Sequence, residues 1–169
     1  NDPMYLGWRH PRISGKEYDD MVERVVLAIQ RKLPQAYLHW EDFGRENARR
    51  NLERYHQQMC TFNDDMQGTG AVTLVALLSA ITRTKVPLTE QRIVIVGAGT
   101  AGTGIADQLC AAMRREGLSQ QEALSRFYLV GRHGLLHQAM PELTAFQKPY
   151  ARSDLAETGT NLSLHEVVK

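Results

Sequence analysis

The sequence predicts an α/β protein that contains part of a parallel β-sheet. Helix-like and strand-like segments alternate along its 169 residues, which is typical of folds in which helices cross between parallel strands. The continuous run Arg92-Ile-Val-Ile-Val96 is typical of a strand that is buried on both faces. A glycine-rich turn follows this run directly and opens a helical segment. Together these three observations predict the fold class.

The first half of the chain is expected to alternate helices with short strands. Ser14 and Glu17 have the spacing of a capping box before apolar residues at helical intervals, and Pro34 stops that helix. The further expected elements are a strand at 36–40, a charged helix at about 45–59, a strand that ends at 63, and a helix from about 68 to 83. The nearly unbroken apolar run from Ala71 to Ile81 predicts that this last helix is buried.

The second half is expected to form one βαβ unit. After the strand at 92–96, the predicted elements are a helix to about Arg115 with Gly117 as its C-cap, a short helix after Ser119 and Glu122, and a strand at 127–130. The tail is rich in proline and polar residues, and it becomes helix-like only after Ser163-x-x-Glu166.

The glycine-rich turn Gly97-Ala-Gly-Thr-Ala-Gly102 matches the G-x-G-x-x-G pattern of dinucleotide-binding folds. The first glycine permits the tight turn, the second lets the backbone approach a pyrophosphate, and the third lets helix and strand pack closely. The alternative is a tight turn without a ligand. Dinucleotide binding is favoured, and it predicts a Rossmann-like sheet. The predicted cofactor-binding residues of the turn are Gly97, Gly99, Thr100, Ala101 and Gly102.

The choice between NAD and NADP depends on the end of the next strand. An acidic residue there would accept the ribose hydroxyl of NAD, but the strand ends Val130-Gly131-Arg132-His133. Arg132 can instead bind the 2′-phosphate of NADP, or it can be an ordinary exposed loop residue. The residues therefore leave the choice between NAD and NADP open.

Two acidic pairs suggest a metal site. Glu41-Asp42 and Asp64-Asp65 each stand at the end of a strand-like run, and four converging carboxylates would repel one another unless a cation held them. Mg²⁺ and Mn²⁺ prefer such oxygen ligands. The alternative is that these acids are helix N-caps and solvated side chains.

Other chemistries find little support. The six histidines and two cysteines lack zinc-ligand spacing, no G-x-S-x-G motif is present, and His39 is expected to be a partly buried strand residue. The arginines of the charged helix, Arg49 among them, alternate with glutamates and are expected to form a solvated face. A net charge of +1 argues against nucleic acid and membrane surfaces, and a reducing cytoplasm is the expected location.

Several longer strings resemble the malic enzyme family, and its bacterial malolactic members in particular. The strings are Asn1-Asp-Pro-Met-Tyr-Leu-Gly7, Leu38-His-Trp-Glu-Asp-Phe-Gly44, Phe62-Asn-Asp-Asp-Met-Gln-Gly-Thr69, Gly97 to Ala106, and Gln147-Lys-Pro-Tyr150. The resemblance runs over nearly the whole chain. It implies that residues 1–86 are the metal-binding end of a catalytic domain and that residues 87–169 begin an incomplete Rossmann-like NAD(P)-binding domain.

The resemblance also implies residue roles. Glu41, Asp42 and Asp65 would ligate Mg²⁺ or Mn²⁺, Asp64 would support catalysis beside them, and Thr69 would approach the NAD or NADP cofactor. The general-base lysine and general-acid tyrosine of the family match no residue here. The chain is therefore expected to be an internal piece of a larger enzyme, and the resemblance implies that this enzyme is a homo-oligomer.

The implied reaction is oxidative decarboxylation of malate to pyruvate and CO₂ with reduction of NAD(P). One alternative is the malolactic reaction, which converts malate to lactate and CO₂ with a tightly held NAD. An alternative of another class is a nucleotide-binding fragment that has no activity by itself.

Overall fold

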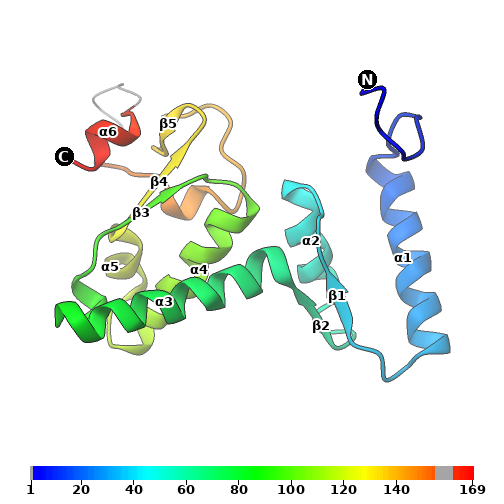
Figure 1. Ribbon diagram of the computed structural model, residues 1–169, viewed down its shortest axis with the longest axis horizontal. Coiled ribbons are helices and arrows are strands. Elements are labelled where there is room, and N and C mark those ends of the chain that lie inside the picture. The colour runs from blue at the N-terminus through cyan, green and yellow to red at the C-terminus, as the bar shows by residue number, and fades with distance from the viewer. Residues whose placement is uncertain (1, 155–161) are drawn as a thin grey trace. The chain divides into compact units, whose positions relative to one another are not determined.

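The computed structural model describes residues 2–154 and 162–169, and the chain divides into two compact units (Figure 1). The first unit is Asn1–Tyr37 and the second is Leu38–Lys169. The domain boundary expected at residues 86 and 87 stays a prediction.

The first unit consists mainly of one helix, α1 (Gly15–Lys32). Val22 and Val26 are buried on it, as the apolar spacing predicts. The capping box predicted at Ser14 is wrong, because the Ser14 side chain makes no capping hydrogen bond. Gly15 explains the difference: its φ is +57°, so the first helical position is left-handed instead of continuing the regular geometry that a capping box requires.

The second unit begins with a small parallel sheet. The strands β1 (Leu38–Trp40) and β2 (Thr61–Asn63) pair in register, so that Trp40 lies opposite Asn63. The crossover between them is α2 (Arg45–Tyr55), whose Tyr55 ring stacks on Trp40 at 5.9 Å between ring centroids. This helix is shorter than expected. The His56 ring donates from Nδ1 to the Glu53 carbonyl at 2.8 Å and so satisfies one of the terminal carbonyl groups.

A short π-helix, η1 (Asp64–Gly68), follows β2 and leads directly into α3 (Thr69–Thr84). Figure 1 shows α3 as the long green helix that links the small sheet to the second sheet. The prediction that this helix is buried is wrong for one side of it. Val72 and Val75 are 71% and 64% exposed, whereas the side that carries Leu74, Leu77 and Ile81 packs against the core.

The second sheet has the order β3-β4-β5. The strands β3 (Ile93–Val96) and β4 (Phe127–Gly131) are parallel and β5 (Gly134–Leu135) is antiparallel, while α4 (Thr100–Arg115) and the short α5 (Gln120–Ser125) form the crossover. The βαβ prediction is confirmed. The expected burial of β3 on both faces is wrong, because Ile95 faces the core but Val96 is 66% exposed.

Three helix-terminating or helix-capping features of this unit form where the sequence predicts them. Gly117 follows α4 with φ of +111°, and capping boxes form at Ser119 with Glu122 and at Ser163 with Glu166. The latter begins α6 (Leu164–Val167). Among its described residues, the unit also contains two single-turn 3₁₀ segments, η2 (Leu88–Glu90) and η3 (Lys148–Tyr150).

The core of the second unit lies between the second sheet and the helices α3, α4 and α5. Its largest fully buried side chains include Leu88, Leu109, Met113, Phe127 and Leu129. Tyr150 of η3 closes the core and packs edge-on against Phe127 at 5.6 Å between ring centroids. Among the described residues, no helix is long and apolar enough to cross a membrane.

Candidate functional site

The two acidic pairs lie at the same edge of the first sheet. Because Trp40 and Asn63 are paired at the ends of parallel strands, the residues that follow each strand emerge side by side. A direct contact joins them: the Asp42 backbone N–H donates to Asp65 Oδ2 at 2.9 Å. The structure therefore brings together the two acidic loops, as the sequence predicts.

Asp42 has an unusual backbone conformation. Its φ is +61°, in the left-handed region that few residues other than glycine adopt. Asparagine and aspartate tolerate this region best, and the hydrogen bond to Asp65 holds the Asp42 amide in place. Backbone conformations of this kind cluster at functional sites, where the surrounding structure stabilises them.

Asp64, a member of the second acidic pair, is the first residue of η1, which leads into α3. Its Oδ1 atom is 3.9 Å from His39 Nε2, and His39 is more exposed than the sequence suggests. A methyl group on Gly68 would fall 2.2 Å from the same oxygen, so the carboxylate lies directly against the Gly68 backbone. Thr69, the first residue of α3, donates from its hydroxyl to the Asp64 carbonyl at 3.3 Å.

The donor set suits a hard cation in type and place, but it is not preassembled. All candidate ligands are carboxylate oxygens, the donors that Mg²⁺ and Mn²⁺ prefer. In the described parts of the chain, however, no three such side chains surround a common point. The N-cap part of the alternative is wrong, because Gly44 occupies the N-cap of α2 and the Asn63 side chain caps η1. Glu41 and Asp42 are exposed, which agrees with its other part, solvated side chains. Binding of an ion would therefore require Glu41, Asp42 and Asp65 to turn inward.

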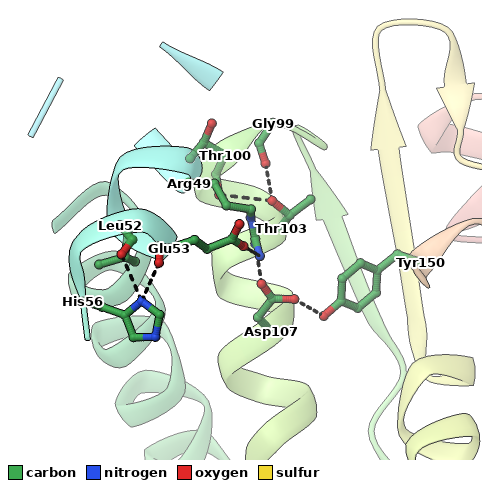
Figure 2. Close-up of polar contacts among 9 residues, drawn as sticks. All are labelled: Arg49, Leu52, Glu53, His56, Gly99, Thr100, Thr103, Asp107 and Tyr150. Carbon is green, nitrogen blue, oxygen red and sulfur yellow. Dashed lines mark hydrogen bonds and ion pairs between the residues drawn. The ribbon is translucent and has the colours of Figure 1, made fainter. Parts of the chain in front are cut away.

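The glycine-rich turn has the geometry that its pattern predicts. Gly97 has φ of +110°, and Gly99 is the N-cap residue of α4. A Cβ atom on Gly102 would fall only 1.8 Å from the Gly97 carbonyl oxygen, so this position accepts glycine alone. Figure 2 shows how Thr103 supports the turn from the helix, with its hydroxyl donating to the Gly99 carbonyl at 2.9 Å. The turn leads into the N-terminus of α4, the end of a helix at which backbone N–H groups can bind an anion.

The acidic segment packs directly on the helix that follows the glycine-rich turn. A Cβ atom on Gly104 of α4 would lie 2.9 Å from Met66 Cα in η1, and one on Gly70 would lie 2.6 Å from Gln108 Cγ. These close approaches have no room for side chains. The two candidate sites therefore belong to one tightly packed arrangement of η1, α3 and α4.

The end of β4 lies beside the glycine-rich turn. Arg132 is exposed in the turn between β4 and β5. A Cβ atom on the preceding Gly131 would meet Ala98 Cβ at 3.7 Å, an ordinary contact distance, so position 131 faces the glycine-rich turn. A side chain there would be well placed to touch a nucleotide bound at the turn.

A polar network links α2, α4 and η3 (Figure 2). Asp107 of α4 accepts from Arg49 Nη2 at 2.5 Å through one oxygen and from the Tyr150 hydroxyl at 2.6 Å through the other. The Arg49 guanidinium also lies 5.5 Å from the centre of the Phe146 ring. Burial, followed by the charge of Asp107, raises the pKa of Tyr150 far above its usual value. Tyr150 is therefore a hydrogen-bond donor throughout the physiological range.

This network is the part of the site that sequence reasoning missed. The solvated-face prediction is wrong for Arg49, whose side chain is only 21% exposed. Local spacing explains the error, because Arg49 also has Glu53 one helical turn away, at 3.7 Å. The stronger partner, Asp107, is 58 residues further along the chain, and no local pattern connects the two.

Comparison with known families identifies the chain. A family profile described as "Malic enzyme, NAD binding domain" matches residues 66–169, and one described as "Malic enzyme, N-terminal domain" matches residues 1–56. The chain belongs to the malic enzyme family. The resemblance seen in the sequence motifs is thus confirmed.

Curated malic enzymes are similar over most or all of the chain. The NAD-dependent malic enzyme 3 of Bacillus subtilis is 54% identical over 153 residues, which are 90% of this chain and 27% of that protein. The NAD-dependent malic enzyme of Erwinia tasmaniensis is 45% identical over 174 aligned positions, which cover 100% of this chain and 31% of that protein. The chain thus spans less than a third of the length of these relatives.

Solved malic enzymes share the fold. The NAD-dependent malic enzyme of Thermotoga maritima matches with a TM-score of 0.63 and 23% identity, over 91% of this chain and 36% of that one. The malic enzyme of Entamoeba histolytica matches with a TM-score of 0.64 and 24% identity, over 90% of this chain and 30% of that one. The predicted α/β, Rossmann-like fold is confirmed. The roles of individual site residues stay predictions.

Proposed function

We propose that the complete protein carrying this chain oxidatively decarboxylates malate to pyruvate and CO₂ and reduces NAD. The packing of η1 on α4 carries this proposal, because it joins the acidic edge and the glycine-rich turn. Hydride transfer from malate needs the substrate and the nicotinamide to be held together, which such an arrangement favours. Membership of the malic enzyme family supports the same reaction.

Glu41, Asp42 and Asp65 are proposed to hold Mg²⁺ or Mn²⁺, with Asp64 supporting them. The ion, when bound, would polarise the oxygen on C2 of malate and offset the negative charge that develops as CO₂ leaves. The Asp42 amide orients the Asp65 carboxylate through the bond of 2.9 Å. His39, 3.9 Å from Asp64, would keep that carboxylate at the edge of the site.

The nucleotide is proposed to bind at residues 97–102. Backbone N–H groups of Gly99 and of the first turn of α4, with Thr100 and Ala101, would hold the pyrophosphate, and Thr69 would approach the cofactor from α3. NAD is proposed as the working cofactor because the family profile describes an NAD-binding domain. Arg132 would let NADP bind as well, since a guanidinium can pair with the 2′-phosphate.

The experiment that tests this function uses the complete protein with malate, Mn²⁺ and NAD. We expect NADH and pyruvate to form in equal amounts, with NADH followed by absorbance and pyruvate and lactate by chromatography. Lactate without accumulating NADH would establish the malolactic alternative instead. Failure to form either product, in a protein that still binds NAD, would support the non-catalytic alternative.

A second measurement tests the metal ligands. Asp65→Asn removes a charge but keeps the shape of the side chain, so we expect the apparent Kd for Mn²⁺ to rise at least about tenfold. Glu116→Gln, at an exposed position after α4, is the matched control and should leave Mn²⁺ binding unchanged. Mn²⁺ affinity equal in the Asp65→Asn variant and the unaltered protein would remove Asp65 from the ligand set.

We also propose that the complete enzyme forms homo-oligomers and is located in the cytoplasm.

A further inference from the structure

The backbone of the glycine-rich turn accepts a hydrogen bond from the side chain of Gln147, which lies 49 residues beyond Ala98 in the sequence. Gln147 donates from Nε2 to the Ala98 carbonyl at 2.7 Å, and its Oε1 accepts from the Thr144 backbone N–H at 3.0 Å. A backbone amide can only donate, so Oε1 must face Thr144 and the NH₂ group must face Ala98. The two contacts together fix the orientation of the Gln147 amide.

The Ala98 carbonyl belongs to the same peptide group as the Gly99 N–H. In a trans peptide these two groups point in opposite directions. A side chain that fixes the direction of the carbonyl therefore also fixes the direction of the N–H. Gly99 is the second glycine of the pattern, at which the backbone comes closest to a pyrophosphate. Ala98 itself is buried, so water cannot readily replace the Gln147 amide.

The segment that carries Gln147 is itself anchored on the same helix as the turn. Three residues further on, the Tyr150 hydroxyl donates to Asp107 of α4 at 2.6 Å, and the Tyr150 ring packs against Phe127. Gln147 also accepts, through its backbone carbonyl, from the Tyr150 N–H at 3.0 Å. The donor at Ala98 is thus held by the structure instead of being a mobile surface side chain.

We propose that Gln147 is a positioning residue for the dinucleotide, which holds the peptide between Ala98 and Gly99 so that the Gly99 N–H faces the pyrophosphate. The inference rests on the proposed function of the glycine-rich turn. No bond of the pyrophosphate changes in the reaction, so Gln147 affects nucleotide binding and leaves hydride transfer untouched. Loss of its hydrogen bond should raise Kd and KM for NAD about fivefold, with kcat at saturating NAD preserved.

The test compares Gln147→Leu and Gln147→Glu with the unaltered complete protein. Leucine removes both hydrogen bonds, whereas glutamate keeps an acceptor for Thr144 and loses only the donor to Ala98. Binding of NAD, ADP and adenosine is measured by calorimetry. We expect NAD and ADP to weaken about fivefold in both variants and adenosine, which has no phosphate, to bind unchanged. Gln138→Leu, at an exposed position of the same region, is the matched control.

A pH series separates positioning from a general loss of structure. A protonated glutamate at position 147 can donate again, so NAD affinity of the Gln147→Glu variant should recover as the pH falls through the pKa of the new carboxyl group. Unchanged NAD affinity in both variants, or equal losses for ADP and adenosine, would overturn the proposal for Gln147 alone. An unaltered protein that binds neither NAD nor ADP would overturn the proposed nucleotide site and this inference together.

Discussion

Arg49 of α2 and Asp107 of α4 join these two helices, with Arg49 Nη2 2.5 Å from Asp107 Oδ2 (Figure 2). The helix α2 follows Glu41 and Asp42, and α4 follows the glycine-rich turn. Asp107 also accepts from Tyr150, so one carboxylate holds three segments that are far apart in the sequence. The pair therefore helps to hold α2 and η3 against α4, the helix that follows the glycine-rich turn.

Replacement of Asp107 should destabilise the second unit. In Asp107→Ala, the largely buried Arg49 guanidinium and the buried Tyr150 hydroxyl both lose their shared acceptor. We expect the free energy of unfolding to fall by about 2 kcal/mol, less than for a fully buried pair because Asp107 is partly exposed. Urea denaturation measures this change. Asp20→Ala, which breaks the exposed pair of Asp20 with Lys16, is the control and should cost less than about 0.5 kcal/mol. Equal losses would contradict a special role for Asp107.

Alkaline pH should destabilise the fold through Tyr150. Burial and the nearby Asp107 raise the pKa of Tyr150 in the folded state, so the unfolded chain loses this proton first as pH rises. Its contribution to stability is present below the ordinary tyrosine pKa of about 10 and is lost progressively above it. Thermal melts from pH 8 to 11 should therefore show a steeper decline for the unaltered protein than for Tyr150→Phe. The same slope in both would refute the assignment.

Two alanine substitutions in the glycine-rich turn should affect different properties, one the stability of the fold and the other the binding of NAD. In Gly102→Ala the new methyl group would lie 1.8 Å from the Gly97 carbonyl oxygen, so we expect a loss of stability of several kcal/mol, on the order of an overpacked core position. A Cβ atom on Gly99 has no neighbour within 4 Å, so Gly99→Ala should keep the melting temperature. Because that methyl group would occupy the approach to the pyrophosphate, we expect NAD binding to weaken at least about tenfold. Normal NAD affinity in Gly99→Ala would place the pyrophosphate elsewhere.

The end of β4 should set the balance between NAD and NADP. Arg132→Ala should weaken NADP more than NAD, because only NADP has the 2′-phosphate that a guanidinium binds. Gly131→Asp adds a carboxylate where a Cβ atom meets only ordinary contacts, so we expect it to favour NAD by a further factor of about ten. Kd values for both nucleotides test the two changes. Parallel losses of NAD and NADP in Arg132→Ala would exclude contact with the 2′-phosphate.

Local patterns in the sequence predict the elements that depend on neighbouring residues. The G-x-G-x-x-G turn, Gly117 at the C-terminal end of α4 and the capping box at Ser119 all form where expected, since a few adjacent residues determine each. The pairing of β1 with β2 follows from their order in an alternating α/β chain. Family membership is likewise visible in short strings, because each string carries several constrained side chains.

Features that depend on distant partners could not be predicted in this way. The apolar residues of α3 and β3 show which side chains favour burial, but the sequence does not show which of them other elements cover. Val72 and Val96 are therefore exposed, against expectation. Arg49 has a local glutamate that hides its tertiary partner. Gln147 is one of two glutamines in the polar tail, and only the folded chain places its amide against Ala98. The carboxylates predict a metal site by their type and strand position, but among the described residues no three of them surround a common point.

The close packing of Gly104 on Met66 affects how α4 and η1 can move relative to each other. Where a side chain sets a spacing, a change of rotamer can alter it, whereas here one helix backbone rests on another. Such a spacer has no torsion angle that can relax independently. Because the Gly104 backbone leaves no space beside Met66, we expect α4 and the Asp64–Gly68 turn to move together, so that a displacement of the helix would also displace the carboxylates.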